Sequence, residues 1–242
     1  MRALAFLLAV LAAPAEAAIC RDMIFEDQPY TVCEIQAGQD LRLFLNGPDG
    51  AFGGFTALEA DLAQDGETLG FAMNAGMFHP NLSPVGLYIE NGVEMVPIVT
   101  SDGPGNFGLL PNGVFCVGED FAVIESRAYD KNRPPCRFAT QSGPMLVIDG
   151  ALHPQFKPDS DSLNRRNGVG VSADGQTAYF AISNRAVNFA SFARLFRDGL
   201  GVPNALYFDG SISRLYAPEL GRSGSGFAVG PMIGLVLPKA GN

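Results

Sequence analysis

Short apolar runs separated by turn-forming residues recur along most of this 242-residue chain. The clearest is 87–95, which holds Asn91-Gly92 at its centre, the hairpin turn favoured where both positions need positive φ. Similar runs, paired across short turns, occur at 30–36 with 41–45, at 114–117 with 121–124, within 145–152, and at 169–171 with 177–182. Because Gly (29) and Pro (17) are also abundant, the pattern predicts many short strands and few long helices.

Two segments predict short helices. Thr56 and Glu59 have the spacing of a capping box, which predicts a helix from Thr56 to about residue 64, ended by Gly66. A second helix is expected after Asn188 as its cap, because apolar residues recur there with helical spacing: Phe189, Phe192, Ala193 and Phe196.

Each predicted helix is followed by a similar strand. The first leads to 69–73, which ends at Asn74, and the second leads to 205–208, which ends at Asp209. This order fits a weak internal duplication, but strand ends attract Asn and Asp in any case, so both explanations stay open. No linker rich in Pro and Ser divides the chain, and we expect one α+β domain over 18–242. Its mostly antiparallel or mixed sheet would pack on a few short helices.

Residues 1–17 have the features of a secretory signal peptide. Arg2 supplies a positive start, the apolar run 4–13 is too short to span a bilayer, and Ala-Glu-Ala at 15–17 fits the cleavage rule. Ile19 before Cys20 does not fit a lipoprotein signal, which needs a small residue there. No later apolar run reaches about 18 residues, so we expect a periplasmic or secreted protein without a transmembrane segment in the mature chain.

The cysteines of an exported chain are candidates for disulfides. Four of them allow three connectivities. We predict the nearest-neighbour set, Cys20 with Cys33 and Cys116 with Cys136, each closing a short loop worth roughly 3 kcal/mol by chain entropy. The chain has no C-x-x-C spacing and only 2 histidines, so no metal site and no cofactor is predicted, although a divalent cation stays open.

Charge and spacing argue against several other classes of protein. The chain has 16 basic and 25 acidic residues, a net charge of −9 and no basic run, so we expect no nucleic-acid partner. Residues 103–108 match G-x-G-x-x-G, but 109–113 (Leu-Leu-Pro-Asn-Gly) cannot open the helix that a dinucleotide site needs. Asp159 and Asp161 resemble the start of a calcium loop that lacks its Gly and distal Glu.

Polar motifs interrupt the apolar strands at separate places in the chain. They are Asn-Ala-Gly-Met-Phe at 74–78 with Pro-Val-Gly-Leu at 84–87, Arg-Arg-Asn-Gly-Val-Gly at 165–170, and Asp-Gly-Ser-Ile-Ser at 209–213. Gln-Ser-Gly-Pro at 141–144 is a fourth candidate. Each alone is typical of a turn. Together they supply an amide, a guanidinium, a carboxylate and close-approach glycines, a set that suits an anionic sugar ligand.

The order of these motifs resembles the phosphodiester glycosidase domain family over roughly 69–235. That family's pattern runs Asn-Gly-Gly-Phe-Phe, Pro-x-Gly-Leu, Gly-Pro-x-Leu, Arg-Thr-x-x-Gly and Asp-Gly-Gly-Gly-Ser. The matching positions here are Asn74, Gly76, Phe78, Pro84, Gly86, Leu87, Gly143, Pro144, Leu146, Arg166, Gly170, Asp209, Gly210 and Ser213. The chain departs from the pattern at Ala75, Met77, Asn167, Ser211 and Ile212. Side chains in place of glycine narrow the approach of the backbone to a ligand.

The resemblance implies hydrolysis of a sugar-1-phosphodiester in a glycan or glycolipid. A departing phosphate is a weak base, so one carboxylate and an arginine can serve where ordinary glycosidases use two carboxylates. On this hypothesis Asp209 is the nucleophile or general base at the anomeric carbon, Arg166 holds the phosphate and Asn74 bonds the sugar, all three lining one cleft. The residues expected to bind substrate are Gly76, Phe78, Gly86, Gly143, Gly170, Gly210 and Ser213.

Two alternatives to this hydrolase remain open from the sequence. One is a non-catalytic envelope glycan-binding protein, which would keep the arginine and the glycines without needing a reactive carboxylate. The other is a phosphodiesterase that cleaves the phosphorus–oxygen bond. In each case the expected partner is a small-molecule or glycan phosphodiester.

Overall fold

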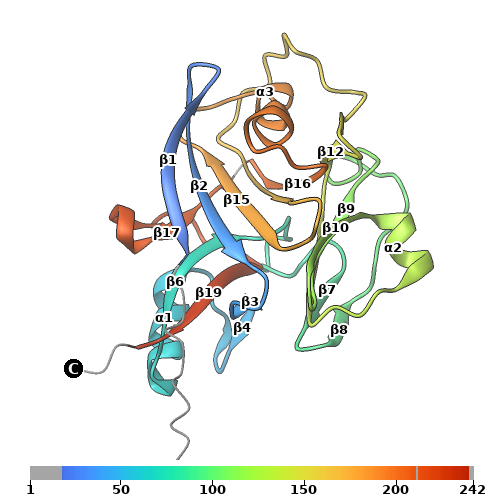
Figure 1. The fold of residues 1–242 in the computed structure, drawn as a ribbon. Helices are drawn as coiled ribbons and strands as arrows, with labels where there is room; N and C mark the ends of the chain where they lie inside the picture. Colours follow the sequence, from blue (N-terminus) through green and yellow to red (C-terminus); the bar gives the residue numbers. More distant parts are fainter. Residues whose placement is uncertain (1–17, 211, 240–242) are drawn as a thin grey trace, which may run out of the picture.

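The computed structural model of the protein describes residues 18–210 and 212–239. The predicted signal peptide at 1–17 therefore lies outside the described residues. The described chain forms three sheets, with the helices on their outer sides (Figure 1). The helical elements are α1 (Phe55–Leu62), η1 (Ala63–Asp65), α2 (Ser126–Asn132), α3 (Phe189–Arg194), η2 (Leu195–Gly199) and η3 (Pro218–Leu220).

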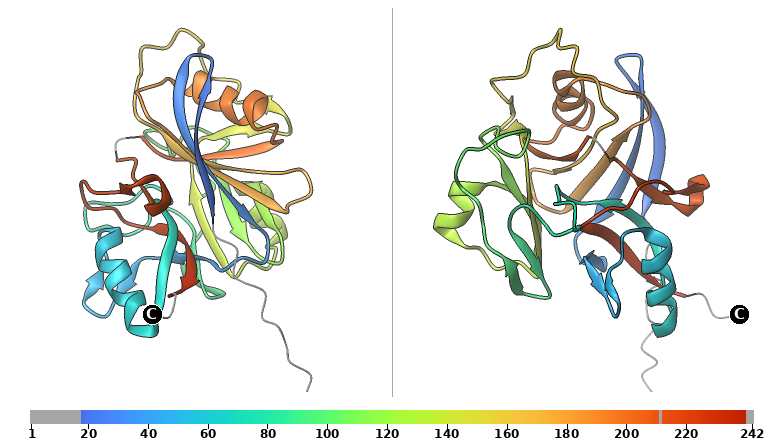
Figure 2. Two further views of the ribbon diagram at one scale, coloured as in Figure 1. Left: turned by 60° about the vertical axis from the view of Figure 1, so that its left-hand side comes forward. Right: turned by 180° about the vertical axis from the view of Figure 1, so that it is seen from behind.

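Sheet I has seven strands in the order β1-β2-β15-β14-β16-β12-β13. Helix α3 covers one face of this sheet, where Phe192 and Phe196 are buried among strand side chains (Figure 2). The strands of sheet I are β1 (Ile19–Phe25), β2 (Gln28–Gln36), β12 (Met145–Ile148), β13 (Ala151–Leu152), β14 (Asn167–Val171), β15 (Thr177–Ser183) and β16 (Asn204–Asp209).

Sheets II and III have five strands each, in the orders β18-β17-β6-β19-β3 and β10-β9-β11-β7-β8. Helix α1 packs on sheet II through Phe55, Leu58 and Leu62. Sheet II contains β3 (Leu41–Phe44), β6 (Glu67–Asn74), β17 (Leu215–Ala217), β18 (Arg222–Ser223) and β19 (Met232–Pro238). Sheet III contains β7 (Tyr88–Glu90), β8 (Val93–Val96), β9 (Gly113–Val117), β10 (Phe121–Glu125) and β11 (Phe138–Ser142), and a small ribbon pairs β4 (Asn46–Gly47) with β5 (Gly50–Ala51).

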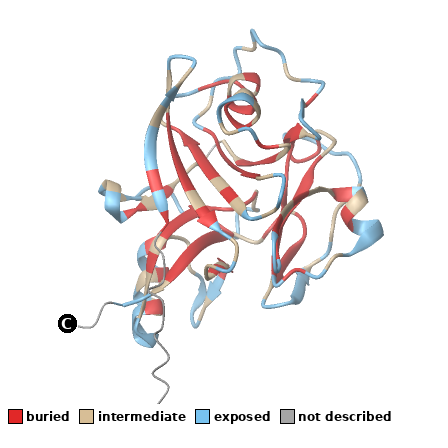
Figure 3. Cartoon of the chain, viewed as in Figure 1, coloured by how far each residue is buried: buried red, intermediate tan, exposed pale blue. Residues whose placement is uncertain are grey.

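The main core lies where the three sheets meet, and strands of all three contribute buried residues to it (Figure 3). The ring of Phe180 in sheet I makes a tilted contact with Phe71 of sheet II at 5.0 Å and a T-shaped contact with Phe115 of sheet III at 5.7 Å, measured between ring centroids. Aromatic pairs at this spacing contribute beyond the apolar area that they bury. The inner strands are therefore held by one shared core rather than by three separate ones.

Four of the five predicted hairpins are confirmed, the pairing of 30–36 with 41–45 is wrong, and every described strand pair is antiparallel. Asn91 (φ 51°) and Gly92 (φ 78°) both have the positive φ that their turn requires. The runs at 30–36 and 41–45 also form strands, β2 and β3, but these lie in different sheets because the chain crosses from sheet I to sheet II between them. The α+β prediction is confirmed.

The two helices occur where they were expected, but only one has the predicted cap. The Asn188 side chain accepts from the backbone N of Ser191 at 2.8 Å, as predicted. The capping box is wrong: α1 begins at Phe55 without a side-chain cap, which places Thr56 inside the helix. Glu59 instead accepts a hydrogen bond from the Tyr216 hydroxyl at 2.7 Å, because that face of the helix packs on sheet II.

The disulfides join the predicted pairs. Cys20–Cys33 links β1 to β2, and Cys116–Cys136 links β9 to the segment before β11. The helix-then-strand order occurs twice, α1 before β6 and α3 before β16, but the strands lie in different sheets, and the duplication stays a prediction. Among the described residues no helix is both long and apolar enough to cross a membrane.

Candidate active site

Three strand ends from two sheets meet at one place in the molecule. Strand β14 begins at Asn167, which lies opposite Asp209, the last residue of β16, in the register of sheet I. Strand β6 of sheet II ends at Asn74, and Asn167 Nδ2 donates to the Asn74 backbone oxygen at 2.8 Å and to Asn74 Oδ1 at 3.1 Å. The fold thus brings together Asn74 and Asp209, although 135 residues separate them in the chain.

Asn167 is the residue that joins these strand ends. It is fully buried, and its Oδ1 accepts from the backbone N of Asp209 at 3.1 Å while lying 3.2 Å from Ser213 Oγ. An asparagine amide has donors on one atom and an acceptor on the other, so one side chain can hold both sheets. The sequence interpretation gave it no role. Its position at the start of a buried strand, directly after Arg166, was the available signal.

The amide of Asn74 is engaged by the loop that follows β16. Its Nδ2 donates to the backbone oxygen of Ile212 at 2.7 Å, and its Oδ1 accepts from the backbone N of Arg214 at 2.9 Å. With the Asn167 contacts, these bonds leave the side chain 0% exposed. In this structure Asn74 braces the loop at 212–214, and its contact with a sugar stays a prediction.

Arg166 lies behind the site with its guanidinium 0% exposed. Its Nε donates to the backbone oxygen of Val187 at 2.9 Å, Nη1 to the Tyr207 hydroxyl at 3.2 Å and Nη2 to the backbone oxygen of Ser162 at 2.9 Å. Its Cζ lies 3.6 Å from the ring centroid of Phe189, a short cation–π contact. Of its five N–H groups, one on each terminal nitrogen has no partner among the described residues.

No described carboxylate lies within 4.0 Å of the Arg166 guanidinium. Burial lowers its pKa below the usual arginine value, against the opposing influence of Tyr207, but an arginine remains charged in proteins. Buried charges are normally paired because desolvation penalises the charged form. An unpaired buried cation therefore marks this region as a candidate functional site.

Gly210 lies between Arg166 and Asp209. A Cβ built on Gly210 would overlap the Tyr207 hydroxyl and lie 3.5 Å from Arg166 Nη1, so only glycine fits. Tyr207 is two residues before Asp209 on β16, and the pairing of β16 with β14 shifts register between them. Burial, with a smaller contribution from Asp209, raises the pKa of Tyr207, which keeps its hydroxyl protonated. The sequence interpretation gave Tyr207 no role, and its place in the strand that ends at Asp209 was the available signal.

A cavity of about 400 Å³ opens in front of Asp209, within the size range of small-molecule sites. Of the described residues that line it, only Asp209 has an ionisable side chain. The lining residues are Met77, Phe78, Val85, Pro104, Gly105, Asn106, Phe107, Asp209 and Ile212. Four of these come from the loop 103–108, which the sequence interpretation treated only as a rejected nucleotide motif. Asn74 and Arg166 lie behind the cavity rather than in its wall.

The other predicted site residues divide into two groups. Phe78 lines the cavity, Gly76 (φ 143°) is buried in the turn before it, and the Ser213 hydroxyl lies 2.8 Å from the backbone oxygen of Asp209. Close packing instead explains three glycines outside the cavity lining. A Cβ would meet the Gln141 and Phe107 side chains at Gly86, Asn112 at Gly143, and Phe196 with Val202 at Gly170.

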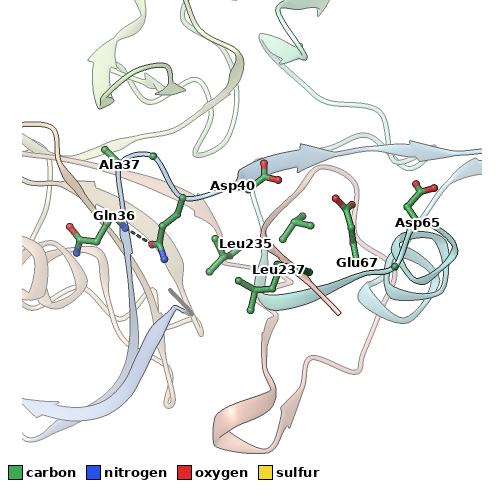
Figure 4. Close-up of a pocket in the computed structure, with 12 residues that line it drawn as sticks. Gln36, Ala37, Asp40, Asp65, Glu67, Leu235 and Leu237 are labelled. Atoms are coloured by element: carbon green, nitrogen blue, oxygen red, sulfur yellow. Dashed lines mark hydrogen bonds between the residues drawn. The ribbon is translucent and has the colours of Figure 1, made fainter. Parts of the chain in front are cut away.

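A larger cavity, of about 690 Å³, lies elsewhere, between the 36–40 segment and the ends of β6 and β19 (Figure 4). Its carboxylates include Asp40 and Glu67, and both bind Arg42: Nε donates to Asp40 Oδ1 at 2.9 Å and Nη2 to Glu67 Oε1 at 2.8 Å. These charges are already paired. In the described part of the chain, no group of three or more His, Cys, Asp or Glu side chains is placed to hold a metal ion.

The fold and site thus define an antiparallel α+β protein that places a strand-end carboxylate beside an unpaired buried arginine. The sequence model of the phosphodiester glycosidase family matches residues 67–235, and the chain belongs to that family. The uncharacterized protein YigE of Escherichia coli (strain K12) is 40% identical over 167 residues. That match covers 69% of this chain and 65% of YigE, so the matched part spans just under two thirds of that relative.

Two solved structures share the fold. The zebrafish N-acetylglucosamine-1-phosphodiester alpha-N-acetylglucosaminidase catalytic domain, auto-inhibited by its pro-peptide, has a TM-score of 0.62 at 14% identity, covering 92% of this chain and 84% of that one. A hypothetical protein from Synechocystis has a TM-score of 0.60 at 16% identity, covering 91% and 62%. At these identities, the likeness concerns the fold alone.

Proposed function

We propose that this chain is an exported hydrolase that cleaves the glycosidic C–O bond of a sugar-1-phosphodiester. The observation that carries the proposal is the fully buried, unpaired Arg166 beneath Gly210, next to the cavity that Asp209 lines. Membership of the phosphodiester glycosidase family supports the reaction class. The substrate named for the zebrafish enzyme supports a sugar-1-phosphodiester, and the two disulfides support export.

In the proposed mechanism the sugar occupies the cavity, with Phe78 and Phe107 against its apolar faces. Asp209 attacks the anomeric carbon or activates the water that does so. The bond between that carbon and the bridging oxygen breaks, and the electron pair leaves with the phosphate. Water supplies the new hydroxyl of the sugar, and the products are a free sugar and a phosphomonoester.

Arg166 stabilises the phosphate as its charge grows in the transition state. Because this attraction strengthens as the bond breaks, it raises the rate rather than binding alone. Its low-dielectric surroundings strengthen the effect. The Gly210 N–H donates to Asp209 Oδ1 at 2.6 Å and so orients the carboxylate.

One observation favours a second candidate, a glycan-binding protein without activity. Ordinary glycosidases place two carboxyl groups at the scissile bond, whereas Asp209 alone supplies one among the described cavity residues. A binding protein would use the charge of Arg166 in the same way, to hold an anionic glycan. It would need neither turnover nor a reactive carboxylate.

Hydrolysis in ¹⁸O-labelled water separates these functions. Purified mature protein is incubated with a panel of sugar-1-phosphodiesters, beginning with an N-acetylglucosamine-1-phosphodiester, and both products are analysed by mass spectrometry. We expect the label in the sugar. Label in the phosphomonoester would establish phosphorus–oxygen cleavage instead, and binding without hydrolysis across the panel would support the glycan-binding function.

A further inference from the structure

The arginines of this acidic chain fall into two sets. In one set the guanidinium lies within 4.0 Å of a carboxylate, as in Arg21, Arg42, Arg133, Arg137, Arg194 and Arg197. In the other set no such pair is formed within the described part of the chain, and these arginines are Arg127 on α2, Arg165, Arg166, Arg185, Arg214 and Arg222. In a protein with net charge −9, arginines without an acid partner are the candidates for binding an anion.

Two of the unpaired arginines meet at Asn184, at the edge of sheet I where β15 ends. Arg165 Nη2 donates to the Asn184 backbone oxygen at 3.2 Å, and Arg222 Nη1 donates to Asn184 Oδ1 at 2.8 Å. Arg222 Nη1 also donates to the Thr31 hydroxyl of β2. Each guanidinium thus bonds described residues through one terminal nitrogen, which leaves its other nitrogens for a ligand.

The two side chains are held differently. Arg165 is exposed, whereas Arg222, on β18, is partly buried and its Nη1 reaches the Thr31 hydroxyl of β2. Burial lowers the pKa of Arg222, the charge of Arg165 lowers it further, and the exposed Asp22 opposes both. Asp22 itself accepts from the Thr31 hydroxyl at 2.5 Å. One acid therefore faces two arginines, and the local charge stays positive.

Arg165 of this pair is linked to the candidate active site through its backbone. Arg165 precedes Arg166 in the chain, and its backbone oxygen lies 2.9 Å from Ser213 Oγ, which lies 2.8 Å from the backbone oxygen of Asp209. The proposed function puts the sugar in the cavity and its phosphate nearest Arg166, and from there we take the next group of the substrate to extend toward Arg165. That group is the one that leaves with the phosphate.

We propose that Arg165 and Arg222 form a second anion-binding subsite, which takes a phosphate or carboxylate group on the leaving-group side of the substrate. This inference rests on the proposed function for the place of the sugar. Two planar guanidinium groups match the oxygens of either anion. Binding both charges of one molecule raises affinity through effective concentration, so the preferred substrates are those with a second negative charge beyond the phosphodiester.

Calorimetry with inorganic orthophosphate and tripolyphosphate tests the subsite without requiring turnover. We expect the wild-type protein to bind tripolyphosphate at least about tenfold more tightly than orthophosphate at low salt, since the longer anion reaches both subsites. Arg165→Glu combined with Arg222→Gln should reduce that ratio to about threefold or less. The matched control is Arg127→Ala on α2, an exposed arginine that also forms no ion pair within the described chain and should leave the ratio unchanged.

Outcomes that overturn the proposal are distinct from those that overturn the proposed function. Equal ratios in wild type and double variant, or no anion binding by the wild type, would refute the subsite. A loss of the ratio in the double variant supports it even if ¹⁸O labelling shows phosphorus–oxygen cleavage or no hydrolysis. If the double variant does not fold, the Arg165→Glu variant alone decides, because the Arg165 side chain is exposed. The subsite is then refuted if the ratio of tripolyphosphate to orthophosphate affinity falls by less than threefold from its wild-type value.

Where hydrolysis is measurable, kinetics give a second readout. Two diesters of the same sugar are compared, one with a neutral leaving group and one whose leaving group carries an extra phosphate. The Arg165→Glu variant should raise KM at least about tenfold more for the second diester than for the first, with kcat changing less than KM. Equal changes in KM for the two diesters would contradict the subsite.

Discussion

The two principal cavities of this protein differ in whether a carboxylate balances the charge of the neighbouring arginine. In the larger one, Arg42 binds Asp40 and Glu67, and these carboxylates raise its pKa above the usual arginine value. Beside the smaller one, Arg166 is buried against Phe189 without an acid partner among the described residues, and burial lowers its pKa. Our proposal therefore places the anionic substrate beside the unpaired charge rather than in the larger cavity.

The largest expected effect is a loss of activity when the acid of the smaller cavity is neutralised, with no such loss for an acid of the larger cavity. Asp209→Asn keeps the shape of the side chain and removes its charge, so kcat for a sugar-1-phosphodiester should fall at least about 100-fold while KM changes little. Asp40→Asn is the matched control in the larger cavity and should leave kcat unchanged. Initial rates over a range of substrate concentrations measure both. An Asp209→Asn variant that keeps the wild-type kcat would contradict the role of Asp209 as nucleophile or general base.

A smaller effect is expected from Gly210→Ala. The new Cβ would overlap the Tyr207 hydroxyl, so that ring and Arg166 behind it must shift. We expect kcat/KM to fall about tenfold, since small misplacements of charge are costly in catalysis. Tyr207→Phe removes the overlapping atom and should restore part of the loss in the double variant. Strict additivity of the two single changes would show that the overlap is not the cause.

The stacking of Arg166 on Phe189 sharpens the comparison further. Phe189→Leu removes a cation–π contact worth about 2 kcal/mol when desolvated, and we expect kcat/KM to fall about three- to tenfold. Phe138→Leu is the control, because Arg137 lies over that ring at 5.1 Å, away from the cavity. Both variants should lose stability in urea denaturation, but only Phe189→Leu should lose activity. Equal loss of activity in both variants would show that the effect of Phe189→Leu comes from general destabilisation.

The smallest effect is expected at the paired arginine. Arg42→Met removes ion pairs that are partly exposed to solvent, which are worth about 1 kcal/mol or less each. The free energy of unfolding should therefore fall by about 1 kcal/mol, with kcat and KM unchanged. Urea denaturation and initial rates measure the two quantities. A large loss of activity would show that the larger cavity takes part in the reaction.

Local features of the fold were predictable because they depend on neighbouring residues. The Asn91-Gly92 turn, the Asn188 cap and both disulfides involve short sequence separations. The crossing from β2 to β3 was not predictable, since strand pairing depends on partners such as β15 and β19 that lie far along the chain. The start of α1 was also missed, because Glu59 bonds Tyr216, 157 residues away, rather than the helix end.

The candidate site was predictable as a set of strand ends but not as a geometry. The motifs containing Asn74, Arg166 and Asp209 were predicted from their order in the chain, and all three lie within residues 67–235, which the family model matches. Burial of Arg166 behind Gly210 and the place of loop 103–108 in the cavity wall depend on contacts across sheets. Sequence spacing carries no information about such contacts.

The most direct test of the account replaces Arg166 by methionine and measures activity and stability on the same protein. Two backbone oxygens lose a donor, at a cost of about 1–3 kcal/mol each, but the cost of an unpaired buried charge disappears. We therefore expect the free energy of unfolding to change by less than about 2 kcal/mol while kcat/KM falls at least about 100-fold. A variant that loses much stability and yet, once folded, hydrolyses sugar-1-phosphodiesters like the wild type would show that Arg166 serves the fold, and would contradict the account.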